Sequence, residues 1–114
     1  MKKELEPIEN IQWLHASKLD SNDYNPNVVF TPELRLLEWS ILKNGWVQPV
    51  LINKGHLIID GFHRWRLSQD SKKLKKKYNG LTPCVVLDIN RPEAMLLTIR
   101  INRAKGTHTA LKMH

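Results

Sequence analysis

Apolar residues recur along this chain at two spacings, one typical of helices and the other typical of strands. Leu34, Leu37 and Ile41 follow the helical spacing, and the preceding Thr31 and Pro32 are residues that commonly begin a helix. Short apolar runs between turn residues predict strands elsewhere. We expect helices over residues 32–44, 62–77 and 91–102, and strands over residues 11–15, 47–52, 56–59 and 82–89.

The order of these elements predicts an α+β fold with a small mixed sheet flanked by helices. A tight turn at residues 53–55 joins two of the strands into a hairpin, which favours this class over a doubly wound parallel sheet. The length of 114 residues suits one compact domain. We assign residues 1–7 to a flexible leader and residues 8–114 to a single domain.

The chain is strongly basic, with a formal net charge of +7, which favours polyanionic partners such as nucleotides or nucleic acid. Much of the excess lies in one run, and two interpretations of it stay open. The run is either a solvated helix end, where cations complement the helix dipole, or a patch for non-specific DNA binding. The lysines concerned are Lys72, Lys73, Lys75, Lys76 and Lys77.

Several classes of protein are excluded by composition. A hydrophobic content of 41% is too high for a disordered chain, and no apolar run approaches the roughly 20 residues that span a bilayer. The N-terminus lacks the apolar stretch of a signal peptide, so we expect a cytoplasmic protein with no membrane partner. Cys84 is the single cysteine, which rules out an intrachain disulfide and a Cys-rich zinc site. We expect it to be a buried, inert thiol.

The segment from Asp60 to Arg66 carries the clearest chemistry. An apolar strand ends in Asp-Gly and opens directly into a helix, which leaves the first N–H groups of that helix free for an anion. His63, Arg64 and Arg66 place cations in the same first turn, so the segment predicts a phosphate site. Three roles stay open for Asp60: a Mg²⁺ ligand, a catalytic base, or a helix cap.

Two further polar junctions accompany this segment. Gly45 and Gln48 lie between a helix and a strand, where Gln48 is suited to contact a base or ribose. We expect the last helix to break near residues 105–108 and Thr107 to begin another helix that faces phosphate. Residues that can close the site from that side are Asn102, Arg103, Thr107 and His108. Trp46 is the best candidate for an exposed aromatic residue beside the site, and we expect core packing for most of the other tryptophans.

In order along residues 8–114, these segments resemble the N-terminal domain of the ParB family, within the ParB/sulfiredoxin superfamily that includes ParB-like nuclease domains. Asn25-Pro26 is similar to the family's Asn-Pro-Arg loop. Residues 45–49 resemble its Gly-x-x-Gln-Pro box, and residues 61–66 resemble its Gly-Glu-Arg-Arg-x-Arg box. Asn102-Arg103 occupies the place of the family's Glu-Asn-x-x-Arg segment.

The resemblance implies that the domain binds a nucleotide of the CTP or ATP class with Mg²⁺ and serves a DNA-related role in partition, regulation or a mobile element. It also implies DNA, a second copy or another protein as partners. Two alternatives stay open: an NTP-hydrolysing or phosphoryl-transferring enzyme of the serine-kinase-like branch with Asp60 as its catalytic residue, and a DNA nuclease. Sulfiredoxin chemistry is excluded because Phe62 replaces the catalytic cysteine. Phe62 also replaces the acidic residue that helps to hold Mg²⁺ in ParB, so Asp60 is the candidate metal ligand.

Overall fold

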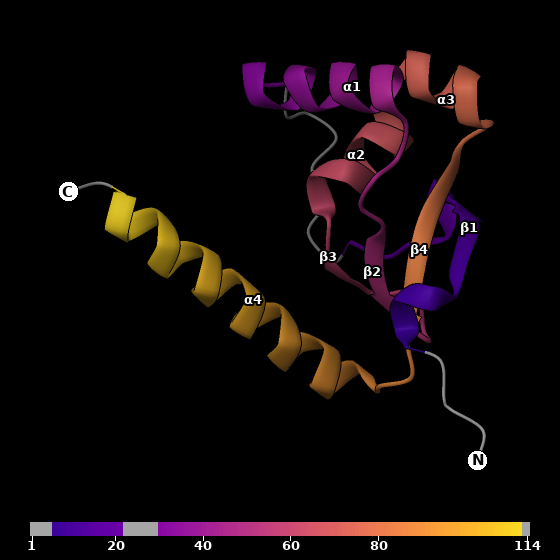
Figure 1. Ribbon diagram of the computed structural model, residues 1–114. Helices are drawn as coiled ribbons and strands as arrows, with labels where there is room; N and C mark the ends of the chain where they lie inside the picture. Colours follow the sequence, from indigo (N-terminus) through magenta and orange to yellow (C-terminus); the bar gives the residue numbers. More distant parts are fainter. Residues whose placement is uncertain (1–5, 22–29, 113–114) are drawn as a thin grey trace.

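A four-stranded mixed sheet forms the centre of the molecule (Figure 1). The computed structural model describes residues 6–21 and 30–112. The Asn25-Pro26 loop and residues 1–5 of the predicted leader lie outside these ranges. The strands occur in the order β1-β4-β2-β3; β2 and β4 are parallel, and the other neighbours are antiparallel. Their bounds are β1 (Ile11–His15), β2 (Val50–Asn53), β3 (Ile58–Asp60) and β4 (Leu81–Leu87). The predicted α+β class is confirmed.

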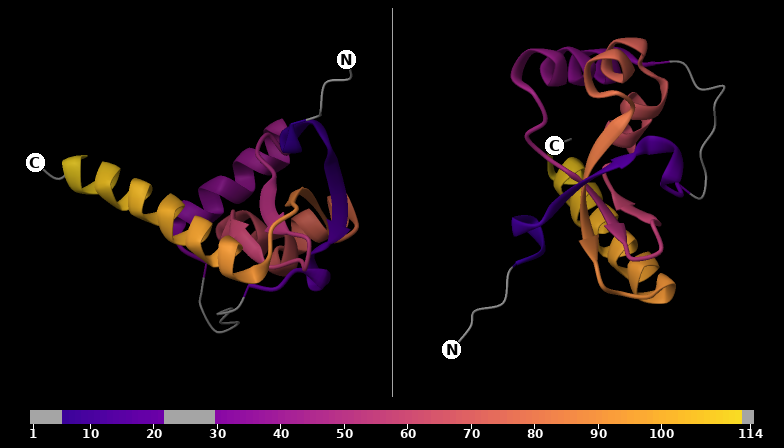
Figure 2. Two further views of the ribbon diagram at one scale, coloured as in Figure 1. Left: turned by 90° about the horizontal axis from the view of Figure 1, so that it is seen from below. Right: turned by 90° about the vertical axis from the view of Figure 1, so that its right-hand side faces the viewer.

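Helices cover this sheet in two separate groups (Figures 1 and 2). Helices α1, α2 and α3 gather at one end of the sheet, and α2 packs on one of its faces. The long helix α4 crosses the opposite face and continues away from the body. Their bounds are α1 (Pro32–Asn44), α2 (Phe62–Asp70), α3 (Lys72–Tyr78) and α4 (Arg91–Lys112), with short 3-10 turns at Pro7–Glu9 and Ala16–Lys18. In the described part of the chain, no helix combines the length and apolarity that a bilayer crossing requires.

Alternation along β3 divides the core between the two faces of the sheet. Ile58 faces α2 and packs near Trp65, whereas Ile59 faces α4 and packs near Ala94. All four side chains are at least 95% buried. A third cluster, which includes Leu67, joins α2 to α1 and α3. The middle of α2, at Trp65 and Leu67, is therefore held between the sheet and the other helices.

The start and end of α1 follow the predicted signals. The Thr31 hydroxyl oxygen accepts a hydrogen bond from the Leu34 amide at 3.2 Å, and Pro32 occupies the first helical position. Gly45 ends the helix with a φ of +83° and donates its N–H to the Ile41 carbonyl at 2.8 Å. The predicted helix over residues 32–44 is confirmed.

Two predicted helix boundaries are wrong. The helix expected over residues 62–77 is two helices, because Ser71 leaves the helical conformation at ψ 118° and caps α3 through the Leu74 amide at 3.2 Å. The break expected at residues 105–108 is absent, and α4 continues to Lys112. A single glycine within a helix costs only about 1 kcal/mol, so Gly106 does not end it. Thr107 therefore does not begin a further helix, and the predicted second phosphate-facing helix end is wrong.

Strand ends and tryptophans also differ in part from expectation. β2 begins at Val50 and not at residue 47, since Pro49 has no amide for the ladder. Trp65 is buried as expected, but Trp13 and Trp39 are 47% and 55% exposed. Trp46 is half-buried against Tyr78, with ring centroids 6.3 Å apart.

Cys84 is a buried residue of β4, as expected. Desolvation by burial raises the pKa of its thiol to about 11, against a smaller lowering by a backbone hydrogen bond from Leu14. The thiol is therefore protonated at neutral pH, and it is inert because the reactive species is the thiolate.

Candidate functional site

The turn between β3 and α2 is built on Gly61. This glycine has a φ of +95°, and a Cβ atom at its position would lie 3.2 Å from the Val50 Cα in the neighbouring strand. The absence of a side chain lets the turn press against β2 and aim the start of α2 at solvent. No described side chain caps α2, so its first N–H groups remain available to an anion. The role of helix cap for Asp60 is thereby excluded.

Asp60 instead holds the long helix α4 at this turn. Its Oδ1 atom lies 2.6 Å from the Lys105 Nζ, and 45 residues separate the two positions. Asp60 also pairs with Leu51 at the end of the sheet, which fixes its backbone. Lys105 was not among the residues predicted from the sequence. An unbroken α4 would have shown that Lys105 lies one turn beyond Asn102, on the same side of the helix.

Arg64 connects the turn to the loop after α1. Its Nη2 donates a hydrogen bond to the Gln48 side-chain oxygen. The loop begins at Gly45, whose positive φ redirects the chain out of α1. Thus the three junctions chosen from the sequence come together: the loop at 45–49, the turn at 60–64, and α4 near residue 105.

The other predicted site residues differ in their placement. His63 is exposed in the first turn of α2, and Arg103 is exposed on α4. Arg66 faces away from the turn: its Nε lies 3.6 Å from Asp70 Oδ2, and its guanidinium lies 5.4 Å from the centre of the Phe30 ring. Arg66 therefore does not join the predicted phosphate ligands. The side chains of Thr107 and His108 lie outside the described part of the structure.

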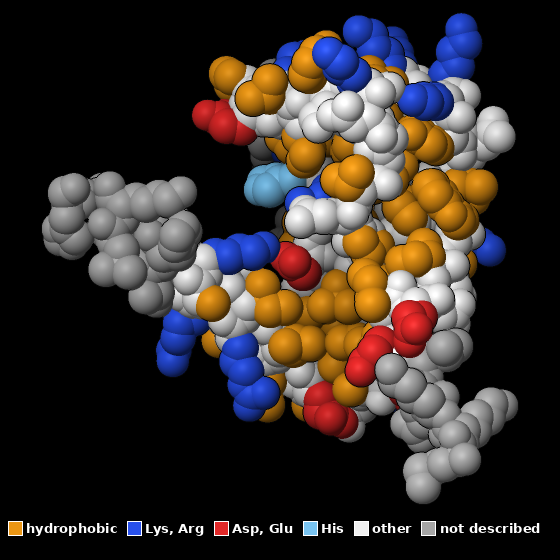
Figure 3. All heavy atoms as spheres, in the orientation of Figure 1, with side chains coloured by type: hydrophobic (Ala, Val, Ile, Leu, Met, Phe, Trp, Pro, Cys, Tyr) orange, Lys and Arg blue, Asp and Glu red, His pale blue; other side chains and the backbone are white. Residues whose placement is uncertain are grey.

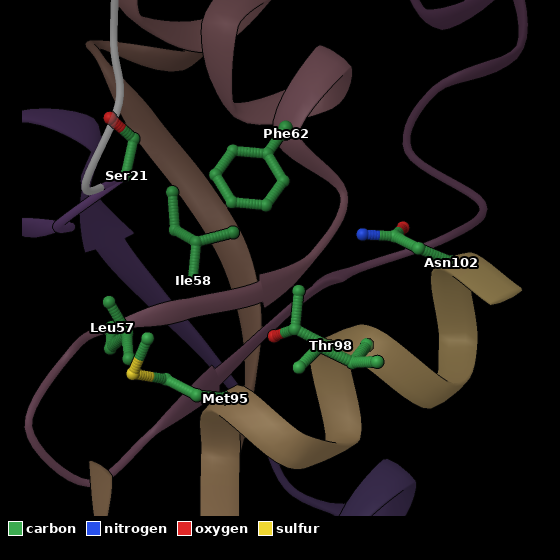
Figure 4. Close-up of a pocket in the computed structure, with 8 residues that line it drawn as sticks. Ser21, Leu57, Ile58, Phe62, Met95, Thr98 and Asn102 are labelled. Atoms are coloured by element: carbon green, nitrogen blue, oxygen red, sulfur yellow. The ribbon is translucent and has the colours of Figure 1, made fainter. Parts of the chain in front are cut away.

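A cavity of about 220 Å³ adjoins the turn on its α4 side. Figure 4 shows Phe62 and Thr98 pointing into the same space, with the Asn102 amide reaching in from the next turn of α4. The Thr98 hydroxyl donates to the Ala94 carbonyl at 2.9 Å, which leaves a mainly apolar wall. Phe62, which replaces an acidic residue of the family motif, is thus part of this wall.

The residues around the turn do not form a magnesium site by themselves. The turn supplies one carboxylate, Asp60, and Lys105 already occupies one of its oxygens. Among the described residues, no three His, Cys, Asp or Glu side chains gather as metal ligands. Magnesium in proteins is held by oxygen ligands, usually together with substrate phosphates. The predicted Mg²⁺ therefore has little support from this set of side chains.

The surface around the turn is hollowed between the α1–α3 group and α4. Figure 3 shows a histidine, basic side chains and an acidic side chain around this hollow. The fold and this turn together define a small α+β domain organised around an open helix N-terminus. The chain belongs to the ParB N-terminal domain family, which matches residues 1–102.

The curated relatives are longer than this chain. It is 39% identical to the uncharacterized protein YbdM of Escherichia coli strain K12, over 95% of this chain and 54% of that protein. It is 30% identical to a probable chromosome-partitioning protein ParB of Rickettsia prowazekii, over 96% of this chain and 37% of that protein. The chain thus spans about half the length, or less, of the relatives it matches.

Solved structures share the fold at low sequence identity. The C-terminally truncated chromosome-partitioning protein ParB of Caulobacter crescentus, complexed with CTP-gamma-S, matches with a TM-score of 0.56 and 22% identity, over 82% of this chain and 52% of that chain. A Pnob8-like ParB-N domain matches with a TM-score of 0.54 and 19% identity, over 82% of this chain and 37% of that chain. These likenesses establish the fold.

Proposed function

We propose that this domain binds a nucleotide through its phosphates at the turn between β3 and α2. The observation that carries the proposal is the convergence of Arg64 and Lys105 on an uncapped helix N-terminus. Backbone N–H groups and the helix dipole favour an anion there, and two cations from separate elements flank the same place. The structural relative from Caulobacter crescentus binds a CTP analogue, which supports the same ligand class here.

Each flanking side chain has a distinct part in this proposal. Arg64 forks onto two phosphate oxygens, and Gln48 holds its guanidinium in place or contacts the base or ribose. Lys105 supplies positive charge beside the phosphates, where Asp60 orients it. The exposed His63 adds a further donor from the first turn of α2. The neutralising charge comes from these cations, so no step depends on a metal ion.

The domain acts in this proposal as a binding module in a DNA-related process of partition, regulation or a mobile element. A ligand at the turn competes with Asp60 for Lys105, so occupancy favours one arrangement of α4 over another. A partner protein or a second copy that contacts α4 would sense the bound state. The family and its chromosome-partitioning relatives support this role.

Calorimetric titration tests nucleotide binding directly. CTP, ATP and tripolyphosphate are titrated into the protein with Mg²⁺ and, separately, with EDTA. We expect binding of at least one nucleotide with a Kd below about 1 mM, and a change of less than about 3-fold when EDTA replaces Mg²⁺, equal to about 0.7 kcal/mol. Absence of binding at millimolar nucleotide would refute the proposal. Loss of binding in EDTA alone would show that the metal supplies the charge assigned to Lys105.

Replacement of Lys105 tests the assignment of that charge. Lys105→Ala removes a cation and leaves the Asp60 carboxylate facing the phosphates, so we expect about 10-fold weaker binding, equal to about 1.4 kcal/mol. Lys54→Ala is the matched control, because Lys54 is also exposed and ion-paired, with 3.2 Å between its Nζ and Asp88 Oδ1. The control is expected to bind within about 2-fold of wild type. Equal losses of nucleotide affinity in both variants would show that the net charge of the protein, and not the position of Lys105, determines binding.

The same titration mixtures separate binding from turnover. After incubation, chromatography of the products shows whether CTP or ATP has lost phosphate. Intact nucleotide is the outcome expected of a binding module. Hydrolysis or phosphoryl transfer that disappears in Asp60→Asn would support the enzymatic alternative. Cleavage of DNA that disappears in the same variant would support the nuclease, although two-metal nucleases use several acidic ligands and this turn has one.

A further inference from the structure

The helix α3 carries the densest charge in the molecule. Its sequence from Lys72 to Tyr78 contains five lysines and no acidic residue, and all five lysines are exposed. With a rise of about 1.5 Å per residue, this helix places roughly one positive charge every 2 Å along its axis. Duplex DNA is also densely charged, with one negative charge per roughly 1.7 Å of axis when both strands are counted, so attraction between the two is strong at low salt.

The lysines of α3 differ from five other described cations in having no carboxylate partner. Within the described residues, Arg35, Lys54, Arg66, Arg91 and Lys105 each lie beside a carboxylate. No described carboxylate pairs with any lysine of α3. Lys72 and Lys73 occupy the first two positions of the helix, where cations oppose the helix dipole. A solvated helix end that complements the dipole accounts for Lys75, Lys76 and Lys77 in the last turn, but not for Lys72 and Lys73.

Contacts with α1 extend the charged surface. The Ser71 hydroxyl donates to Glu38, and the Lys77 Nζ donates to the Leu42 carbonyl at 2.8 Å, so α3 is fixed along α1. On the outer face of α1, Lys43 stands over the Trp39 ring with its Nζ 4.7 Å from the centroid. Figure 3 shows basic and hydrophobic side chains together over α1 and α3. We name the lysines of α3 together with Lys43 the lysine ridge.

We propose that the lysine ridge binds the phosphate backbone of nucleic acid without sequence preference. Lysine ammonium groups on flexible stems act as point charges toward phosphates and do not discriminate between bases. Trp39 is 55% exposed beside them and offers a flat surface on which an unpaired base can stack. The only aliphatic side chain of α3, Leu74, is 1% exposed, so α3 itself has no aliphatic face to insert into a membrane. Because α1 exposes Leu36 beside the ridge, binding to anionic vesicles is one of the outcomes tested.

Fluorescence anisotropy tests the ridge with labelled oligothymidylate and with a labelled duplex of unrelated sequence. We expect both to bind at about 50 mM salt and to lose affinity steeply toward about 200 mM. The double variant Lys73→Gln/Lys76→Gln should weaken binding about 10-fold or more and reduce the slope of log K against log salt by about 2 for the duplex. Lys54→Gln/Arg100→Gln removes the same charge elsewhere and should remain within about 3-fold of wild type.

The outcomes decide the proposal and the form of the ligand. Equal losses in the two double variants would overturn it, because net charge alone would then explain binding. Failure of both nucleic acids to bind at low salt would overturn it too, as would ridge-dependent binding of phosphatidylserine vesicles alone. Trp39→Ala then identifies the form of the nucleic acid. If the variant loses more affinity for oligothymidylate than for the duplex, the ridge binds unpaired strands; if it loses affinity for neither, the ridge contacts only the phosphate backbone.

Discussion

Arg64→Ala is expected to weaken nucleotide binding by about 30-fold to 100-fold. A hydrogen bond to a charged group contributes about 1.5–3 kcal/mol, and Arg64 is the described cation of the turn that can form two of them to one phosphate. Its present partner is the neutral Gln48 amide, and no carboxylate among the described residues forms an ion pair with it. The loss should appear for CTP, ATP and tripolyphosphate alike, because the missing contact is to phosphate. Isothermal titration calorimetry measures each affinity.

Two controls define what the loss at Arg64 means. Arg64→Lys keeps the charge but removes the planar fork, so an intermediate loss of about 10-fold is expected. Arg35→Ala removes an exposed arginine that lies 4.0 Å from Glu38 on α1, and it should bind within about 2-fold of wild type. Thermal unfolding of each variant should stay near wild type, since these side chains are at least partly exposed. Wild-type affinity in Arg64→Ala would remove the turn from the proposed site.

Local signals explain why much of the fold was predictable from the sequence. Thr31, Pro32 and Gly45 act within a few residues of themselves, so they fix α1 wherever the helix packs. The turn at residues 53–55 is equally local, because the Asn53 side chain accepts from the Gly55 and Leu57 amides, each at 2.9 Å. The turn at Gly61 was predicted for the same reason. In each case the physical cause lies within the segment.

The features that sequence reasoning missed depend on competition between signals or on distant contacts. Ser71 is a strong N-cap inside a helical pattern, and its bond to Glu38 of α1 helps to favour the break. Gly106 suggested a helix end because glycine has a low helix propensity, but α4 continues through it. The contact between Lys105 and Asp60 joins positions 45 residues apart, which no spacing rule connects. Trp13 is exposed because β1 is an edge strand, and strand order is not encoded in local pattern.

The two proposed sites lie on opposite ends of α2, and this arrangement bears on how the domain works. The nucleotide turn is at its first residue, Phe62, whereas Ser71 follows its last residue and opens α3. α2 is a rigid connection, since Trp65 and Leu67 are at least 95% buried and the Trp65 indole donates to the Ala16 carbonyl at 2.9 Å. A phosphate at the turn competes with Asp60 for Lys105, which joins the turn to α4, whereas the packing of Trp65 and Leu67 keeps α2 in place. We expect nucleotide to alter α4 and to leave the ridge unchanged.

Gly61→Ala is expected to destabilise the fold and to abolish nucleotide binding together. A residue with a side chain in the left-handed region at φ +95° costs about 1–2 kcal/mol, and the new Cβ would lie 3.2 Å from the Val50 Cα. Backbone atoms of a central strand cannot move aside cheaply, so the turn must shift. We expect a loss of about 2 kcal/mol, seen as a fall in Tm of roughly 10 °C in thermal unfolding. The shift also misdirects the first N–H groups of α2, so binding should fall about 100-fold below wild type at a temperature where the variant is folded.

The matched glycine for this test is Gly55, in the hairpin between β2 and β3. Its φ is outside the left-handed region, and an added Cβ would meet only the Asn53 side chain, at 3.4 Å, which is an ordinary van der Waals contact. Gly55→Ala should change the free energy of unfolding by less than about 0.5 kcal/mol and leave the nucleotide Kd within about 2-fold. Because the turn at Gly61 both seats on β2 and presents the N–H groups, stability and binding must fall together in Gly61→Ala. A variant that is destabilised but binds nucleotide like wild type would show that the ligand lies elsewhere than the start of α2.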